Sequence, residues 1–328
     1  MNSECTQQAP SALDDDPKAK KSMSHSMTTM LKNLTLGLTF GLSALGCSRA
    51  HIEAIELSNE ADGAVKVDTA GAIQKYEQAI QLDPANHLII WKLSKAYEKK
   101  EDWDKMASSL SRAVSVAPGF ANYWERRGYA LTKLAEGGNP DAWNEAKEPL
   151  KKCIEIDPNR AWCHFLLAEA HWWTDETQEA LQAYSHAIEH DPREPSFYVG
   201  LADAYQVLRL YKEAGDVLGQ GTSNIQATEE TRDHVYNMHL LAFNLAQVEG
   251  DRPKMLAAVK QAYEIGGEKH PEAKFHLGST YASMDPPQKE QAKQMLDSFS
   301  NTVCKGAKAK QFKAQCAQAT SFLQRLGT

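Results

Sequence analysis

Cysteine is the residue type with the most varied chemistry to offer in this chain of 328 residues. A thiol can be acylated, oxidised to a disulfide or bound to a metal, depending on its surroundings. Cys47 follows directly after the moderately apolar stretch from Asn33 to Gly46. Four further cysteines form two pairs close in sequence, Cys153 with Cys163 and Cys304 with Cys316. In an oxidising compartment each pair is either a disulfide or two free buried thiols.

The segment before Cys47 has the organisation of an export signal. Residues 1–29 are polar, and residues 30–32 place a charge ahead of the apolar stretch. Small and aliphatic residues followed by cysteine resemble the bacterial lipoprotein box, in which a peptidase cuts before the cysteine and its thiol receives a diacylglycerol. The resemblance implies that Cys47 is the lipidated first residue of the mature chain. The alternatives are an ordinary secretory signal cut near Ala44 and a buried apolar helix with a core cysteine.

Composition narrows the function classes. The chain is 42% hydrophobic and 24% charged, which is typical of a globular protein. Its formal net charge of −7 offers no basic surface for a polyanion, so nucleic-acid binding is not expected. The longest apolar stretch is shorter than the ~20 residues that a membrane-spanning helix needs, which excludes a multi-pass membrane protein.

Prolines mark a repeat along the rest of the chain. Pro84, Pro118, Pro158 and Pro192 are spaced by 34, 40 and 34 residues, and three of them follow an aspartate. A 34-residue period ending in Asp-Pro resembles the tetratricopeptide repeat (TPR), in which each unit is a pair of antiparallel helices. Since one such unit cannot bury its apolar face alone, the resemblance implies a stack of units.

The unit from Ala161 to Glu194 shows why the pattern makes physical sense. Small residues at Ala168, Ala180 and Ala187 let two helices approach closely, and Tyr184 fills the space between them. We therefore expect an all-α fold, a right-handed α-solenoid of about six to seven TPR helix-turn-helix units with a C-terminal capping helix. The expected divisions are a disordered leader with signal peptide (1–46), a lipid-anchored start with a degenerate first helix (47–67), a well-matched array (68–220), degenerate units (221–300) and the capping helix (301–328).

Motifs for catalysis are missing from the sequence. It contains no Gly-rich phosphate loop, HExxH, GxSxG or CxxC. His164 and His171 lie seven residues apart and so share one helix face, which could suggest metal ligation. They occupy repeat places that the TPR family fills with large packing residues, which indicates core histidines. We therefore expect no catalytic residue, metal or cofactor.

Aromatic residues gather where TPR proteins bind their partners. In that family, five places of the first helix of each unit line the concave face. Four of the seven tryptophans fall at such places. An exposed aromatic cluster of this kind is typical of a binding surface. The alternative is that these side chains belong to the core. The expected partner-binding groove comprises Trp91, Tyr129, Trp162, Phe165, Glu169, Trp172 and Trp173.

These observations predict a protein-binding scaffold or assembly factor in the bacterial cell envelope. It would be held by its lipid at the outer membrane, facing the periplasm, because Ser48 after the cysteine is compatible with release from the inner membrane. Lipid-anchored repeat proteins of this kind resemble the type IV pilus pilotins. The alternatives are an intracellular, non-lipidated TPR adaptor and a periplasmic hydrolase on a TPR body. The Lys and Asn of TPR chaperone-tail readers have no counterpart here, since Leu240 precedes the matching Asn244.

Overall fold

The computed structural model describes residues 49–327, and this part of the chain is all α-helical apart from its turns, with no strand. The all-α fold expected from the sequence is therefore confirmed. The helices fall into two compact units, of which the first ends at Ile89 and the second begins at Ile90. No helix within the described residues is both long enough and apolar enough to cross a membrane.

The first unit is a helix pair, α1 (Arg49–Ala64) and α2 (Thr69–Leu82), followed by the start of α3 (His87–Lys99). Small residues fill the interface, since Ala61 and Ala72 are completely buried. Tyr76 is also buried and donates a hydrogen bond from its hydroxyl to Asp62 at 2.5 Å. The carboxylate of Asp68 accepts the backbone N–H of Gly71 and caps the start of α2.

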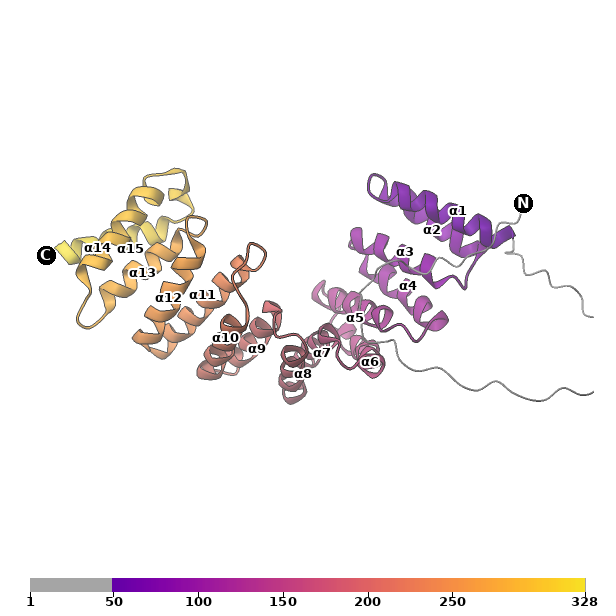
Figure 1. Cartoon of the computed structure of the whole chain (residues 1–328), viewed down its shortest axis with the longest axis horizontal. Helices are drawn as coiled ribbons and strands as arrows, with labels where there is room; N and C mark the ends of the chain where they lie inside the picture. The colour runs from indigo at the N-terminus through magenta and orange to yellow at the C-terminus, as the bar shows by residue number, and fades with distance from the viewer. Residues whose placement is uncertain (1–48, 328) are drawn as a thin grey trace, which may run out of the picture. The chain divides into compact units, whose positions relative to one another are not determined.

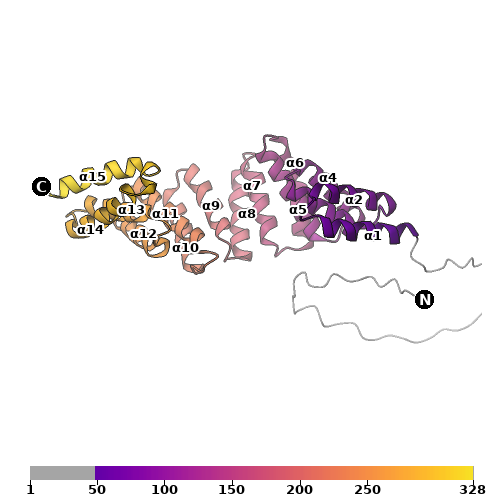
Figure 2. The same ribbon diagram turned by 90° about the horizontal axis from the view of Figure 1, so that it is seen from above.

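The second unit continues the helix pairs in chain order, and consecutive helices lie beside one another (Figure 1). The view in Figure 2 shows the same order of helices. The helices are α4 (Trp103–Val116), α5 (Ala121–Glu136), α6 (Asp141–Ile156), α7 (Ala161–Trp172), α8 (Thr177–His190), α9 (Pro195–Val207), α10 (Tyr211–Asn224), α11 (Arg232–Glu249), α12 (Arg252–Gly266), α13 (Glu272–Ser283), α14 (Lys289–Phe299) and α15 (Lys313–Gly327).

Local sequence explains where the helices begin and end. Asp102 and Asp251 accept backbone N–H groups three residues later and cap the starts of α4 and α12. The Asp-Pro pairs stop the second helix of a unit: α6 ends just before Asp157 and α8 just before Asp191. The residue before a proline is disfavoured in the helical conformation, so these stops recur with the repeat.

The helix bounds differ from expectation where residues are inserted. The sequence suggests that six extra residues around Leu134 to Pro140 enlarge the turn of the third unit. Instead, α5 and α6 have 16 residues each, against 12 in α7 and 14 in α8. Lengthening a helix satisfies each added backbone N–H and carbonyl internally, which a longer loop would not do.

The C-terminal segment also differs from expectation. Within the expected capping segment 301–328, the sequence predicts a single helix of about Lys308 to Leu326. The chain instead forms a π-helical turn at Ser300–Cys304, a 3₁₀ turn at Ala307–Lys310 and then α15. Gly306 between the two turns interrupts the helix. α15 packs against α13 and α14, in the place expected for a capping helix.

Gly128 shows how closely the two helices of a unit approach. A Cβ added at Gly128 of α5 would lie 2.4 Å from the Leu150 side chain of α6, and Leu150 is completely buried. We expect Gly128→Ala to destabilise the fold by about 1–3 kcal/mol, because the core must be overpacked. A Cβ at Gly215 of α10 meets no atom within 4 Å. Gly215→Ala should therefore stabilise by ~0.5–1 kcal/mol through its helix preference.

Urea unfolding of the two variants measures this difference. The two substitutions make the same chemical change within a helix, so helix preference cancels and only the space around Cβ differs. A stabilised Gly128→Ala variant would show that α5 and α6 do not pack as described.

Candidate functional site

The residues singled out on α7 lie on one side of that helix. Trp162, Phe165, Glu169, Trp172 and Trp173 are here called the α7 face. Trp162 is 41% exposed and Trp173 is 61% exposed, whereas Phe165, Glu169 and Trp172 are partly buried. Trp172 packs against the core formed by α7 to α11. The expected aromatic cluster therefore divides into two exposed rings and partly buried residues between them.

Trp162 packs against two phenylalanine rings. Its ring meets Phe165 edge-on with centroids 5.5 Å apart, and it meets Phe197 of α9 at 5.1 Å. Phe197 is completely buried, and Phe165 lies 5.1 Å from it. Such edge-to-face contacts hold the Trp162 ring in place at the surface. An anchor that is already ordered loses little side-chain entropy when a partner binds.

Trp173 is held in a different way, at the C-terminal end of α7. Its ring stacks on Trp143 of α6, with centroids 5.8 Å apart and planes inclined by 13°. Trp143 is itself buried, so one side of the Trp173 ring is covered while most of its surface remains exposed. Two ordered, exposed indoles therefore occupy the two ends of the α7 face.

Glu169 lies between the two tryptophans. Burial raises the pKa of Glu169 above its usual value, whereas hydrogen bonds from Tyr184 and Trp173 lower it. The negative charges of Glu136 and Asp203 raise it further. Tyr184 donates its hydroxyl to Glu169 at 2.5 Å, and burial also raises the pKa of Tyr184, so the phenol stays protonated and keeps donating.

Asp203 on α9 is a residue that sequence reasoning missed. Partial loss of solvent raises the pKa of its carboxyl group, although the residue is exposed. Asp203 occupies the same place in its unit as Glu169 does in the preceding one, and this equivalence is the signal that was available. The charge of Glu169 acts on Lys133, but the ammonium group of Lys133 is paired with Glu136 at 2.6 Å. Within the described residues neither Glu169 nor Asp203 forms an ion pair.

Trp91 and Tyr129 make their ring contacts away from α7. Trp91 of α3 stacks on Tyr123 at 5.2 Å, with the Lys95 ammonium 5.4 Å from its ring centroid. Tyr129 of α5 carries the Arg126 guanidinium 4.3 Å from its ring centroid. The ring contacts of Trp91 and Tyr129 therefore do not form a continuous aromatic stripe that reaches α7. Cations of the chain itself already cover these two rings.

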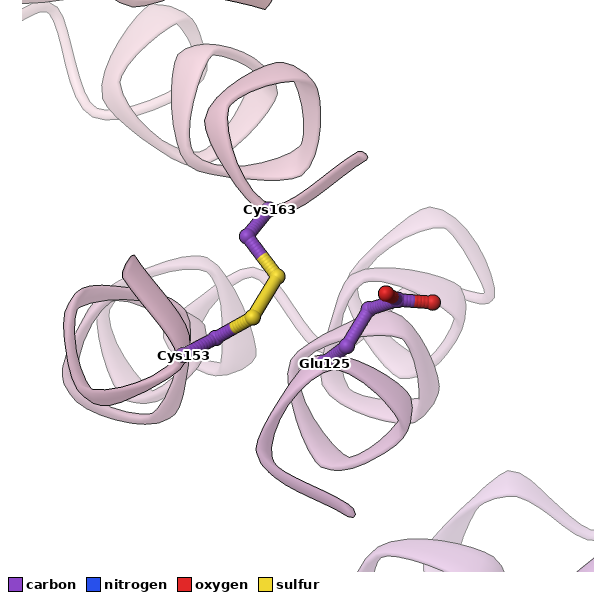
Figure 3. A group of neighbouring side chains, drawn as sticks. All are labelled: Glu125, Cys153 and Cys163. Atoms are coloured by element: carbon purple, nitrogen blue, oxygen red, sulfur yellow. A yellow bond between two sulfur atoms is a disulfide. The ribbon is translucent and has the colours of Figure 1, made fainter. Parts of the chain in front are cut away.

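The cysteines of α6 and α7 form a disulfide next to Glu125 (Figure 3). Cys153 and Cys163 are completely buried, and their Cα atoms are 6.3 Å apart. The Glu125 carboxylate lies within 4.8 Å of both sulfur atoms, a spacing that would suit a metal site. Metals bind the thiolate form of cysteine, however, and Glu125 is already paired with Arg160 at 2.5 Å. The group is therefore structural, and it ties one repeat unit to the next.

A second disulfide joins Cys304 to Cys316 of α15, with Cα atoms 5.6 Å apart. Cys47 lies outside the described residues. His164 and His171 are both buried: His164 Nε2 lies 2.9 Å from the Pro158 carbonyl oxygen, and His171 Nδ1 contacts Glu176. They occupy the packing positions that the repeat assigns to them.

No family model matches the chain. Among curated proteins, the co-chaperone sgt12 of Aspergillus fumigatus is 29% identical over 108 residues, which cover 33% of this chain and 30% of the relative. Hsp70-Hsp90 organizing protein 3 of Arabidopsis thaliana is 28% identical over 163 residues, which cover 47% of this chain and 28% of the relative. The chain thus spans less than a third of the length of these two relatives.

Solved structures show the fold. The C-terminal part of a TPR repeat-containing protein from Cytophaga hutchinsonii matches with a TM-score of 0.58 at 15% identity, covering 77% of this chain and 98% of that one. This similarity shows a TPR-like stack of helix pairs. PilW, described as a type IV pilus biogenesis factor, matches with a TM-score of 0.48 at 17% identity, covering 64% of this chain and 92% of that one.

Proposed function

We propose that this protein is a non-enzymatic scaffold that binds another protein through the α7 face. The observation that carries the proposal is the pair of ordered, exposed indoles of Trp162 and Trp173. Exposed tryptophans on a rigid base are frequent hot spots of protein–protein interfaces. The TPR-like fold supports the same conclusion, because stacked helix pairs offer an extended surface to a partner.

Site-specific photo-crosslinking tests this function. A photoreactive amino acid at Val207, at the end of α9 and 69% exposed, should capture a partner that contacts the face next to α7. The matched control is the same amino acid at Val116, which is 41% exposed at the end of α4. We expect one protein to be captured from Val207 and not from Val116. Equal capture from both positions would contradict a defined binding surface.

We further propose that the chain is lipidated at Cys47 and held at the outer membrane of a bacterium, facing the periplasm. The sequence before Cys47 supports this location, and the two disulfides suit an oxidising compartment. With a net charge of −7, attraction to anionic lipids is not available as an anchor, so acyl chains have to supply it.

Lipidation predicts a simple change of solubility. Cys47→Ala should move the protein from the membrane fraction to the soluble fraction, because the thiol that carries the lipid is lost. The unaltered protein should incorporate labelled palmitate and the variant should not. A parent protein that takes up no label would contradict lipidation while leaving the binding function untouched.

A second candidate function is that of an intracellular adaptor for chaperones, because one of the two curated relatives described above is named a co-chaperone and the other an Hsp70-Hsp90 organizing protein. Organisers that read acidic chaperone tails need a cationic groove. Here the α7 face and its neighbour α9 carry Glu169 and Asp203 instead. A synthetic acidic C-terminal peptide should therefore not bind the full chain in fluorescence anisotropy, and micromolar binding would favour this second function.

A further inference from the structure

The α7 face offers two exposed indoles, and the charges beside them indicate what kind of partner segment it can receive. In the two preceding units, an acidic residue on the first helix has an arginine partner that lies outside that helix. Glu98 of α3 is paired with Arg126, and Glu125 of α5 is paired with Arg160 at 2.5 Å. The chain thus repeatedly balances an acid on this row of helices with a cation.

The pattern stops at α7 and α9. Glu169 and Asp203 form no ion pair within the part of the chain that the structure describes, and Lys133 nearby is engaged by Glu136 at 2.6 Å. The carboxylates act on one another, because Asp203 and Glu136 both raise the pKa of Glu169. Two partly desolvated acids without a cation are unfavourable in the free protein, and a cation supplied from outside would relieve this.

Aromatic rings beside the acids suit the same ligand. Cations are attracted to the faces of indole and phenol rings. The chain uses this contact itself at Tyr129, with Arg126 4.3 Å from the ring centroid, and at Trp91, with Lys95 at 5.4 Å. At the end of α7, Trp173 is 61% exposed, and its side chain is one of the groups that lower the pKa of Glu169, so indole and carboxylate lie together.

We propose that the α7 face, together with Asp203, binds a partner segment through a lysine or arginine side chain that inserts between Glu169 and Asp203. Apolar residues on either side of this cation would contact Trp162 and Trp173. The inference rests on the proposed function, and it adds the chemistry of the partner: a basic residue in an apolar setting rather than an acidic tail. Charge complementarity and exposed aromatic area together select this occupant.

Peptide display on the full chain tests the proposal. A random twelve-residue library is selected on the unaltered protein and on the double variant Glu169→Gln with Asp203→Asn. We expect the unaltered protein to enrich peptides with lysine or arginine next to an aliphatic or aromatic residue. The double variant should lose this enrichment, and a synthetic peptide from the selected pool should bind it at least ten times more weakly.

The variant is chosen so that folding is preserved. Glutamine at 169 keeps an oxygen that can accept the Tyr184 hydroxyl. A carboxyl whose pKa is raised by folding is destabilising when ionised, so removing its charge should not lower stability at pH 7. The matched control is Glu145→Gln with Glu179→Gln, which removes the same charge from exposed positions on α6 and α8. This control should enrich the same peptides as the unaltered protein.

Binding of the selected peptide should also depend on pH. Protonation removes the charge of Glu169 and Asp203. Affinity should therefore be highest at pH values above their raised pKa values, and it should fall as pH decreases from 7 towards them. The effect should be absent in the double variant. The groups that face Glu169 from α5, α8, α9 and the end of α7 are Lys133, Glu136, Tyr184, Asp203 and Trp173.

The outcomes separate the two proposals. Enrichment of apolar peptides without a basic residue, or equal enrichment on the double variant, would overturn the cationic anchor while leaving the α7 face as a binding surface. Enrichment of acidic peptides would also overturn the cationic anchor, because the partner segment would then carry the opposite charge to the one proposed. If crosslinking from Val207 captures no protein, the proposed function itself fails, whatever the library shows.

Discussion

Removing both exposed indoles, by Trp162→Ala with Trp173→Ala, should weaken binding of the partner at least a hundredfold while the fold persists. Aromatic hot spots typically cost about 2 kcal/mol or more each when truncated, and 1.4 kcal/mol corresponds to a factor of ten. Both rings lie at the surface, so their loss opens no cavity. Isothermal titration with the crosslinked partner, or with a peptide selected by display, measures the effect.

The stability cost of this double variant should be moderate and should leave the protein folded. Trp162 gives up edge contacts with Phe165 and Phe197, and Trp173 gives up its stacking on Trp143. Such pairs contribute about 0.5–1.5 kcal/mol each, so the three contacts together contribute about 1.5–4.5 kcal/mol. In a chain of this size, that corresponds to a decrease in melting temperature of several degrees.

Trp172→Ala is the matched control, because it changes the same residue type on the same helix. Trp172 packs against the core of α7 to α11, so its truncation should destabilise the fold more than either surface variant does. The spacing in the sequence would pair Trp162 with Trp172, since both fall on the apolar stripe of this helix that includes Phe165, with Trp173 beside it. A double variant of Trp162 and Trp173 that unfolds would show that these rings are core residues.

The repeat pattern predicted the helix pairs because the same physical need recurs in every unit. Two helices must approach closely, and Ala168, Ala180 and Ala187 are indeed completely buried. Tyr184 fills the space between them and is 2% exposed. Proline then ends the second helix. These constraints act within about 34 residues, so they can be recognised in one unit at a time.

Contacts between units could not be predicted in the same way. Trp173 is ordered by Trp143, which belongs to the second helix of the preceding unit. Trp172 is partly buried because α7 packs against its neighbours, and the repeat places of the two adjacent tryptophans do not distinguish them. Tyr129 occupies a groove place, yet Arg126 lies over its ring. Each outcome depends on a side chain that the repeat consensus leaves free.

The sequence could not show which acidic residues of the α7 face lack a cation partner, for a related reason. Glu169 was identified by its place in the repeat, but its lack of a cation depends on where the neighbouring cations go. Lys133 lies near Glu169 but is paired with Glu136. Arg126 is paired with Glu98 of α3, and Arg160 with Glu125 of α5. Only the arrangement of several units in space shows which acids remain without a partner.

The two disulfides should respond differently to a reductant, because their burial differs. Cys153 and Cys163 are completely buried between α6 and α7, whereas Cys304 and Cys316 are partly exposed. A reductant must contact sulfur, so under native conditions it should open the C-terminal bridge and spare the inner one until the fold opens. Alkylation followed by mass spectrometry distinguishes the two pairs.

Loss of the inner bridge should have the larger consequence for the array. Cys153→Ala with Cys163→Ala should lower the free energy of unfolding by about 3 kcal/mol on a loop-entropy basis, because the bridge closes a short loop between two units. Hydrogen exchange should then accelerate in α5 to α8, since each unit is stabilised mainly by its neighbours. The C-terminal counterpart, Cys304→Ala with Cys316→Ala, should loosen α15 and leave exchange in α5 to α8 unchanged. If removing the inner bridge changes neither unfolding nor exchange, the coupling of these two units rests on helix packing alone, and the bridge has no structural role.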